Sequence, residues 1–228
     1  MKTVIITGAG GNLGRALVKK FVQENYFIAA TLSPGGKVKQ PEKKGQLWQR
    51  VNLAAEDDAA AFVKDIIRLR KQADVLVATA GGFAMGNIAK TRAGDIQHQV
   101  DLNFFTAYNI VRPVFLQMKK QGSGRIFLIG SKAGADASGG KEVIGYSLSK
   151  SLLFRLAEIL NKEAAGTDIV TTVIIPSTID TPQNRKDMPG ADFSTWVKPA
   201  AIAEVISFYA SSAASAIRSP VVKVYGGA

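Results

Sequence analysis

The feature that most constrains the fold of this chain is the glycine-rich stretch TGAGGNLG, which runs from Thr7 to Gly14. An apolar, β-branched run at residues 2–7 precedes it, and an amphipathic stretch at residues 12–24 follows it. This order predicts a strand, a tight turn and a helix. Glycines in such a turn let a pyrophosphate approach the backbone, and the N–H groups of the helix face the anion. A flexible turn also uses glycine, but this position favours a dinucleotide site.

Strand and helix signals alternate along the rest of the chain. Apolar strands separated by helices indicate a parallel sheet with helices on both faces. No repeat, low-complexity tract or linker interrupts the pattern, so we expect one Rossmann-type domain over residues 1–228, a doubly wound α/β fold of about seven strands. The expected strands are residues 2–7, 27–32, 46–53, 73–81, 124–131, 168–176 and 221–226, and the expected helices are residues 12–24, 56–71, about 91–120, 146–165 and about 198–212.

The net charge of +11 comes from 29 Lys and Arg against 18 Asp and Glu. The basic residues are scattered, apart from a loose group at Lys37, Lys39, Lys43 and Lys44. The charge therefore favours a solvated surface, or attraction of an anionic small molecule, over nucleic-acid binding. There is no cysteine and one histidine, His98. We expect no metal site, and we expect His98 to be structural or solvated.

The sequence also bears on where the protein works. The first residues lead almost directly into the first expected strand, without the layout of a signal peptide. No apolar run is long enough to cross a bilayer. Because the absence of cysteine suits a reducing compartment, we expect a cytoplasmic protein with no membrane partner.

The end of the second expected strand, ATLSPGGKVK, bears on the choice of cofactor. An acidic residue at this place binds the ribose hydroxyls of NAD, but Leu32 and Ser33 stand here instead. Ser33, Lys37 or Lys39 could accept the 2′-phosphate of NADP. The sequence therefore favours NADP(H) over NAD(H), with solvated loop lysines as the alternative interpretation.

The stretch GYSLSK places Tyr146 and Lys150 four residues apart, where a helix is expected to begin. Residues four apart share one face of a helix. An ammonium group beside a phenol lowers the pKa of the tyrosine from its ordinary value of about 10. Such a tyrosine is a usable general acid or base near neutrality. The alternative is a half-buried tyrosine beside a solvated lysine.

These features together resemble the short-chain dehydrogenase/reductase family. Its motifs occur in order over essentially the whole chain: the glycine turn, ATAGG after the fourth expected strand, DLNFF, IGSKAG, Y-x-x-x-K and PSTIDT. The resemblance implies an NAD(P)-dependent oxidoreductase in which Tyr146 is the proton donor and Lys150 lowers its pKa and binds the nicotinamide ribose. It further implies that Ser131 holds the substrate heteroatom and that Asn103 holds a water linked to Lys150.

The same resemblance places further residues beside the cofactor. Residues after the third strand would bracket the adenine, and residues after the sixth strand would contact the nicotinamide, unless these are ordinary turns. Aromatic residues and a methionine, Phe83, Met85 and Trp196, would line the substrate pocket unless they belong to the core. The expected cofactor residues are Gly8, Gly11, Asn12, Leu13, Gly14, Ser33, Asn52, Leu53, Ala80, Gly81, Tyr146, Lys150, Pro176, Ile179 and Thr181.

Three segments are more narrowly similar to the dihydropteridine reductases: AGGFAMGN (80–87), IGYSLSK (144–150) and IPSTIDTPQNRKDMPGADFSTW (175–196). This similarity implies reduction of a quinonoid dihydropterin. Dihydropteridine reductases carry an Asp after the second strand and lack the family's catalytic serine, whereas this chain has no such Asp and keeps Ser131. The family also often reads Asn-Ala-Gly where this chain has Thr79, Ala80 and Gly81.

Three functions remain open from the sequence. The first is reduction of a quinonoid dihydropterin, and the second is reduction or dehydrogenation of another carbonyl or alcohol substrate. The third, a non-catalytic dinucleotide sensor, need not keep all four catalytic residues. The expected partners are a small-molecule substrate, carbonyl or pterin-like, and further copies of the chain. A homodimer or homotetramer would be built on the helices near residues 101–120 and 146–165.

Overall fold

The computed structural model describes residues 1–36, 38 and 43–227. Within these residues, seven strands form one sheet in which every neighbouring pair is parallel, in the order β3-β2-β1-β4-β5-β6-β7. This confirms the expected doubly wound parallel sheet. The strands are β1 (Thr3–Ile6), β2 (Phe27–Leu32), β3 (Gln46–Arg50), β4 (Val75–Ala78), β5 (Ser123–Ile129), β6 (Asp168–Pro176) and β7 (Val221–Val224).

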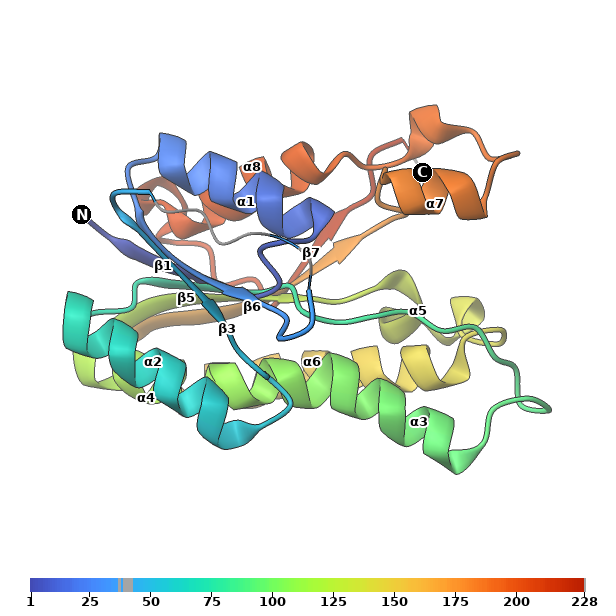
Figure 1. Ribbon diagram of the computed structural model, residues 1–228, viewed down its shortest axis with the longest axis horizontal. Coiled ribbons are helices and arrows are strands. Elements are labelled where there is room, and N and C mark those ends of the chain that lie inside the picture. Colours follow the sequence, from blue (N-terminus) through green and yellow to red (C-terminus); the bar gives the residue numbers. More distant parts are fainter. Residues whose placement is uncertain (37, 39–42, 228) are drawn as a thin grey trace.

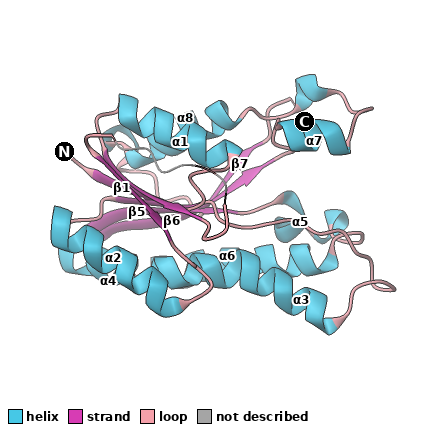
Figure 2. Ribbon diagram, viewed as in Figure 1, coloured by secondary structure: helices cyan, strands magenta, loops and turns pink. Residues whose placement is uncertain are grey.

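Helices cover both faces of the sheet (Figure 1). One layer holds α1 (Asn12–Gln23) and α8 (Pro199–Ala210). The other layer holds α2 (Glu56–Arg70), α4 (Thr106–Gln121) and α6 (Ile144–Glu163), as Figure 2 also shows. Helix α3 (Ala93–Val100) leads into α4 through a π-helical turn, η1 (Asp101–Phe105).

Two hydrophobic clusters fill the space between the sheet and the helices. Along β1, Ile5 faces the cluster beneath α2, α4 and α6, while Val4 and Ile6 face the cluster beneath α1 and α8. Successive side chains of a strand point to opposite faces, and both faces are covered, so every residue of β1 is buried. This double burial explains why the inner strands β1, β2 and β4 are mainly apolar rather than alternating, whereas the edge strand β3 is partly exposed and mainly polar.

The boundaries differ from expectation in several places. The third strand ends at Arg50 rather than at residue 53, because its partner β2 ends at Leu32, which pairs with Arg50. The helical segment expected over 91–120 is divided by η1, and α6 begins at Ile144 rather than at Tyr146. The short elements were not expected: α5 (Lys132–Ala135), α7 (Pro182–Asp187), η2 (Ala137–Gly139), η3 (Phe193–Thr195) and η4 (Ser212–Ala214).

The strand order creates a crevice at the carboxyl edge of the sheet. From β1 the chain continues to β2 on one side, while β4 pairs with the other side of β1. The connections therefore leave the ends of β1 and β4 in opposite directions. In open α/β sheets, ligands bind at such a switch point, and the glycine-rich turn after β1 lies there.

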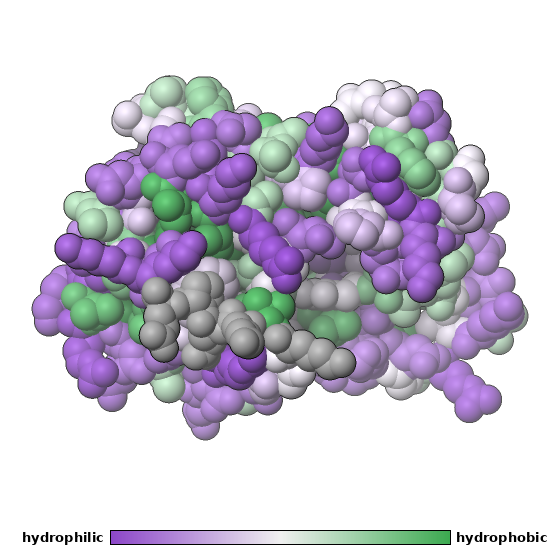
Figure 3. Space-filling model, turned by 45° about the horizontal axis from the view of Figure 1, so that its top comes forward, coloured by the Kyte–Doolittle hydropathy of each residue, from purple (hydrophilic) through white to green (hydrophobic). Residues whose placement is uncertain are grey.

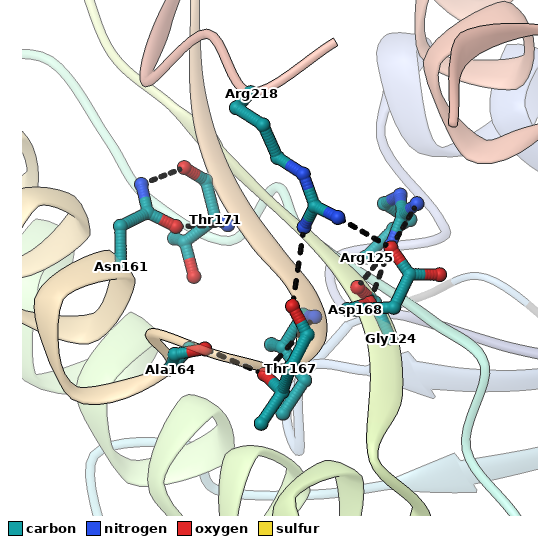
Figure 4. Close-up of polar contacts among 9 residues, drawn as sticks. Gly124, Arg125, Asn161, Ala164, Thr167, Asp168, Thr171 and Arg218 are labelled. Carbon is teal, nitrogen blue, oxygen red and sulfur yellow. Dashed lines mark hydrogen bonds and ion pairs between the residues drawn. The ribbon is translucent and has the colours of Figure 1, made fainter. Parts of the chain in front are cut away.

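A side chain of α6 completes the hydrogen bonding of the first half of β6 (Figure 4). Strand β7 pairs with β6 only from Val173 onward, so the backbone of Thr171 faces no strand on that side. The amide of Asn161 accepts from the Thr171 N–H at 2.8 Å and donates to the Thr171 carbonyl oxygen at 2.8 Å. Because Thr171 is fully buried, both groups would otherwise lack a partner, at a cost of about 1–3 kcal/mol each.

A second cluster in Figure 4 fixes the start of β6. Arg125 of β5 donates to the Asp168 carboxylate at 2.9 Å and to its carbonyl oxygen at 2.6 Å. Arg218, which precedes β7, reaches the same carboxylate at 3.1 Å. One carboxylate thus joins segments around three strands.

On the face of the molecule seen in Figure 3, hydrophilic side chains cover most of the surface and hydrophobic residues form separate patches.

Candidate active site

A cavity of about 540 Å³ opens beside the glycine-rich turn. Its walls are this turn, the end of β2, the residues after β3, and the residues after β4. Seven of the expected cofactor residues line it, namely Gly8, Gly11, Ser33, Asn52, Leu53, Ala80 and Gly81. The described lining residues do not include the other expected cofactor residues, which are Asn12, Leu13, Gly14, Tyr146, Lys150, Pro176, Ile179 and Thr181. The expected lysines 37 and 39 lie outside the described residues.

The glycine turn is built so that the chain can pass close to itself. Gly8 has a φ of +59°, which favours glycine. At Gly14 a Cβ would overlap the carbonyl oxygen of Gly8 and lie 2.6 Å from the Cα of Ala9. The start of α1 can therefore lie against the turn only without a side chain there. A bare backbone at a helix N-terminus is the environment that a pyrophosphate requires, so the turn fits a dinucleotide.

The ends of β1 and β4 are joined by Thr7. Its hydroxyl oxygen accepts from the N–H groups of Thr79 at 3.0 Å and Ala80 at 3.1 Å. The Thr79 hydroxyl donates to the Thr7 carbonyl oxygen at 2.5 Å. The hydroxyl of Thr7 thus fixes the backbone of Thr79 and Ala80, which form one wall of the cavity.

Asn103 is the centre of a buried hydrogen-bond network. Its Oδ1 accepts from the Gly82 N–H at 3.0 Å, and its Nδ2 donates to Gln99 and to the Ser149 hydroxyl at 3.2 Å each. These partners belong to the loop after β4, to α3 and to α6. Because Asn103 lies within η1, the π-helical turn aims the amide at all three. Gly81 lies directly beside it, since a Cβ at Gly81 would approach Oδ1 to 2.6 Å.

The structure brings the other three expected catalytic residues together near this network. Lys150 is buried and donates to the Ile129 carbonyl oxygen at 2.8 Å, and its Nζ lies 5.8 Å from the centre of the Tyr146 ring. Ser131 is buried two residues after the end of β5, where it caps α5, and its Oγ accepts from the Gly134 N–H at 3.0 Å. That contact leaves the Ser131 hydroxyl proton free to donate to another group.

The expectation that Lys150 lowers the pKa of Tyr146 was wrong. Burial raises the pKa of the Tyr146 phenol, and a hydrogen bond with the Ser131 hydroxyl opposes this rise only in part. Lys150 does not contribute to this balance. Burial instead lowers the pKa of Lys150 itself to about 8. The sequence shows that the pair shares a helix face, but burial by distant segments decides the charge of each group.

The buried lysine predicts a pH dependence of stability. The pKa of Lys150 is about 8 in the folded protein, against an ordinary value of 10.5. Between these values the unfolded chain binds more protons, so the free energy of unfolding rises as the pH increases. From about pH 7.5 to about 9.5, we expect urea unfolding to show a gain of about 1–2 kcal/mol in the wild type that Lys150→Met lacks. Lys162→Met, an exposed change on the same helix, is the control. Equal pH profiles for the wild type and Lys150→Met would contradict this assignment.

Two of the three residues expected to line the substrate pocket, Phe83 and Met85, lie close to Tyr146. Phe83 is 63% exposed, and its ring meets the Tyr146 ring edge-on at 5.0 Å. Met85 borders a second cavity of about 240 Å³, which Tyr146 and His98 also line. His98, expected to be structural or solvated, therefore lies near the site. Trp196 packs against Phe193 at 4.7 Å.

The segment after β6 forms a separate polar unit. Thr181 accepts from the Asn184 N–H at 3.1 Å and caps α7. Ile179 pairs with Val197, and Asp180 forms an ion pair with Arg185 at 2.6 Å. Pro176, Ile179 and Thr181 thus stay expectations for nicotinamide contact.

The larger cavity is also lined by residues that were not expected there, and Arg50 is the charged one among those that the structure describes. The third strand was expected to continue to residue 53, so the position of Arg50 at its end was not recognised.

Within residues 1–36, 38 and 43–227, no helix is long and apolar enough to cross a membrane. In the same part of the chain, no group of three His, Cys, Asp or Glu could hold a metal ion.

Comparisons with known proteins agree with this geometry. A family model described as short chain dehydrogenase matches residues 2–191. An acetoacetyl-CoA reductase of Acinetobacter sp. (strain RA3849) is 25% identical over 247 residues, covering 99% of this chain and 97% of that relative. The 3-oxoacyl-(acyl-carrier-protein) reductase FabG of Thermotoga maritima is 27% identical over 240 residues, again covering 99% and 97%.

Solved structures share the fold. ElxO with NADP bound superposes with a TM-score of 0.89 at 21% identity, covering 99% of this chain and 97% of that chain. Thermoplasma acidophilum aldohexose dehydrogenase, in ligand-free form, gives a TM-score of 0.86 at 25% identity, covering 99% and 93%. Dihydropteridine reductase is not among these relatives, so they support the broad resemblance and not the narrower one.

Proposed function

Because the chain belongs to the short-chain dehydrogenase family and is an NAD(P)-dependent oxidoreductase, we propose that it reduces a small carbonyl compound with NADPH. The observation that carries this proposal is the clustering of four groups: Tyr146 lies beside Ser131 and Lys150, and Lys150 and Asn103 lie next to Gly81, which lines the cavity that begins at the glycine turn. A dinucleotide sensor would need the cavity but not these four groups.

The bound nicotinamide supplies the hydride, and the protein supplies the proton and the orientation. The Ser131 hydroxyl, whose oxygen already accepts from Gly134, would donate to the substrate oxygen and hold it beside the phenol of Tyr146. Tyr146 would then transfer its proton to that oxygen. The raised pKa of the phenol keeps this proton in place at neutral pH.

Lys150 and Asn103 would position these groups. The Lys150 ammonium lies 3.5 Å from where a Cβ of Gly81 would stand, so the bare backbone of Gly81 leaves room for a ribose next to it. Asn103 fixes the loop after β4 through the Gly82 N–H. Both residues are buried, so their geometry does not depend on surface side chains.

The preference for NADP(H) over NAD(H) rests on the adenosine end of the cavity. The described residues of its lining include no Asp or Glu. An acid there would bind the ribose hydroxyls of NAD and repel a 2′-phosphate. Ser33 at the end of β2 offers a hydroxyl donor instead. ElxO, which shares this fold, was solved with NADP.

A β-oxo carbonyl is the first substrate class to test, since an acetoacetyl-CoA reductase and 3-oxoacyl reductases are among the relatives. A quinonoid dihydropterin is the second candidate, and the segment 175–196 supports it through its similarity to dihydropteridine reductases. The exposed Phe83 ring beside Tyr146 would contact either substrate.

The test is oxidation of NADPH and of NADH, followed side by side with acetoacetyl-CoA, ethyl acetoacetate and quinonoid dihydropterin as acceptors. We expect turnover with NADPH and at least one β-oxo compound, with slower turnover for NADH. Turnover only with the dihydropterin would favour the second candidate. A folded protein that binds NADPH but reduces none of these acceptors would contradict the substrate class.

Exposed apolar side chains on one helix layer support self-association. Leu116 of α4 and Leu148, Leu152 and Ile159 of α6 are each between 38% and 54% exposed. Helices α4 and α6 cover the same face of the sheet (Figure 1). The homodimer or homotetramer expected from the sequence would bury these side chains between copies of the chain.

A further inference from the structure

Arg50 stands at the adenosine end of the larger cavity. In the register of β2 and β3 it pairs with Leu32, the last residue of β2. Its Cα therefore lies at the same level of the sheet as the strand end where a carboxylate would select NAD. Arg50 is exposed and lines the cavity together with Ser33 and Gly36.

The guanidinium of Arg50 is held in one orientation by two carbonyl groups. Its Nη1 donates to the Ser33 carbonyl oxygen at 2.8 Å, and its Nη2 donates to the Val38 carbonyl oxygen at 2.9 Å. These contacts use two of the five N–H groups of the guanidinium. The remaining N–H groups are available to an anion, and the fixed plane reduces the entropy lost when one binds.

The charge of Arg50 is not neutralised by the described part of the chain. No ion pair between described residues involves Arg50. Among the described residues that line the cavity, Arg50 alone is charged. A fixed guanidinium that has no acidic partner among the described residues is suited to a phosphate, which it binds through two parallel hydrogen bonds.

Gly36 leaves space beside this group. A Cβ at Gly36 would lie 2.7 Å from the Ser33 hydroxyl oxygen and 3.5 Å from Nη1 of Arg50. A side chain there would therefore fill the space between the serine hydroxyl and the guanidinium. Without one, both donors can approach the same anion.

We propose that Arg50, at the end of β3, is the residue that selects NADP(H) by binding the phosphomonoester on the adenosine ribose. This inference rests on the proposed function, and it goes further by naming the residue and the group it binds. The alternative role for Arg50 is structural, because the same two carbonyl contacts could simply support the turn formed by residues 33–36. The two roles differ in one respect: support of the turn affects NADPH and NADH alike, whereas phosphate binding affects only NADPH.

The experiment measures dissociation constants by calorimetry for NADPH, NADH, adenosine 2′,5′-bisphosphate and 5′-AMP, so that binding is read without turnover. The variants are Arg50→Gln, which keeps hydrogen-bond donors for the turn but loses the charge, and Arg50→Lys, which keeps the charge but loses the planar fork. The control is Arg68→Gln, a loss of the same charge at a side chain that is 79% exposed on α2.

We expect Arg50→Gln to weaken NADPH and adenosine 2′,5′-bisphosphate by about 10- to 100-fold, with NADH and 5′-AMP within about threefold of the wild type. Arg50→Lys should lie between the two proteins, and Arg68→Gln should match the wild type. An equal loss for NADPH and NADH, or no loss for either, would overturn the inference. If the wild type bound neither dinucleotide, the proposed function would fail as well, and the wild type alone would show this.

Discussion

Replacement of Tyr146 by Phe should lower the turnover number for carbonyl reduction by about 10³-fold and leave the NADPH dissociation constant within about threefold. The change removes one hydroxyl and keeps the ring, which meets Phe83 edge-on at 5.0 Å. The fold and the cofactor cavity should therefore be unchanged. The loss is large because the phenol is the group that gives its proton to the substrate oxygen in the proposed reaction.

The matched control for this experiment is Tyr209→Phe. Tyr209 lies on α8, in the opposite helix layer from Tyr146. Its replacement should leave both turnover and NADPH binding unchanged. Stopped-flow absorbance of NADPH gives turnover, and calorimetry gives binding. Turnover retained in Tyr146→Phe would remove Tyr146 as the proton donor, whereas loss of NADPH binding would assign it a role in holding the cofactor.

Replacement of Gly14 by Ala should damage both stability and cofactor binding. A Cβ at this position would overlap the Gly8 carbonyl oxygen and lie 2.6 Å from Ala9 Cα and 3.0 Å from the Ala9 carbonyl carbon. All of these atoms belong to the backbone, so no side-chain rotation relieves the contact. The start of α1 must move away from the turn, and such overpacking costs about 1–3 kcal/mol. We expect NADPH to bind at least about 10-fold more weakly, because the displaced N–H groups no longer face the pyrophosphate.

Gly94→Ala controls for the change of residue type. A Cβ at Gly94, in α3, would have no atom within 4 Å. Alanine is the better helix former, so this variant should be as stable as the wild type or slightly more stable. Urea unfolding and NADPH titration of both variants compare the two positions. If Gly14→Ala unfolded and bound NADPH like Gly94→Ala, the close packing of the turn would not matter.

The sequence predicts elements well where the signal is local. Most strands contribute a short apolar run and the long helices an amphipathic one, so the sheet could be predicted before its register was known. Where a strand ends depends on its neighbour instead. Arg50 ends β3 because Leu32 ends β2, and no property of residues 50–53 shows this. Helix α7 could have been predicted, because Thr181 followed by Pro182 is a helix-start signal.

The site shows the same division. The motif residues Ser131, Tyr146 and Lys150 were found because the family resemblance gives their spacing. The network around Asn103 could not be predicted, because its partners Gly82 and Ser149 are distant in sequence. The tyrosine pKa was predicted in the wrong direction because burial depends on the whole fold.

The all-parallel sheet has a further consequence for how the chain folds. Its central strand, β4, pairs with β1 so that Val75 lies beside Val4. Parallel neighbours cannot be joined by a tight hairpin and need a crossover. The pairing of β1 with β4 therefore brings together two strands that are separated in sequence by α1, β2, β3 and α2. Proteins dominated by such long-range pairings fold slowly, since loop-closure entropy is lost before native contacts compensate for it. We therefore expect slow refolding from urea, during which the apolar strands of this chain are exposed to aggregation.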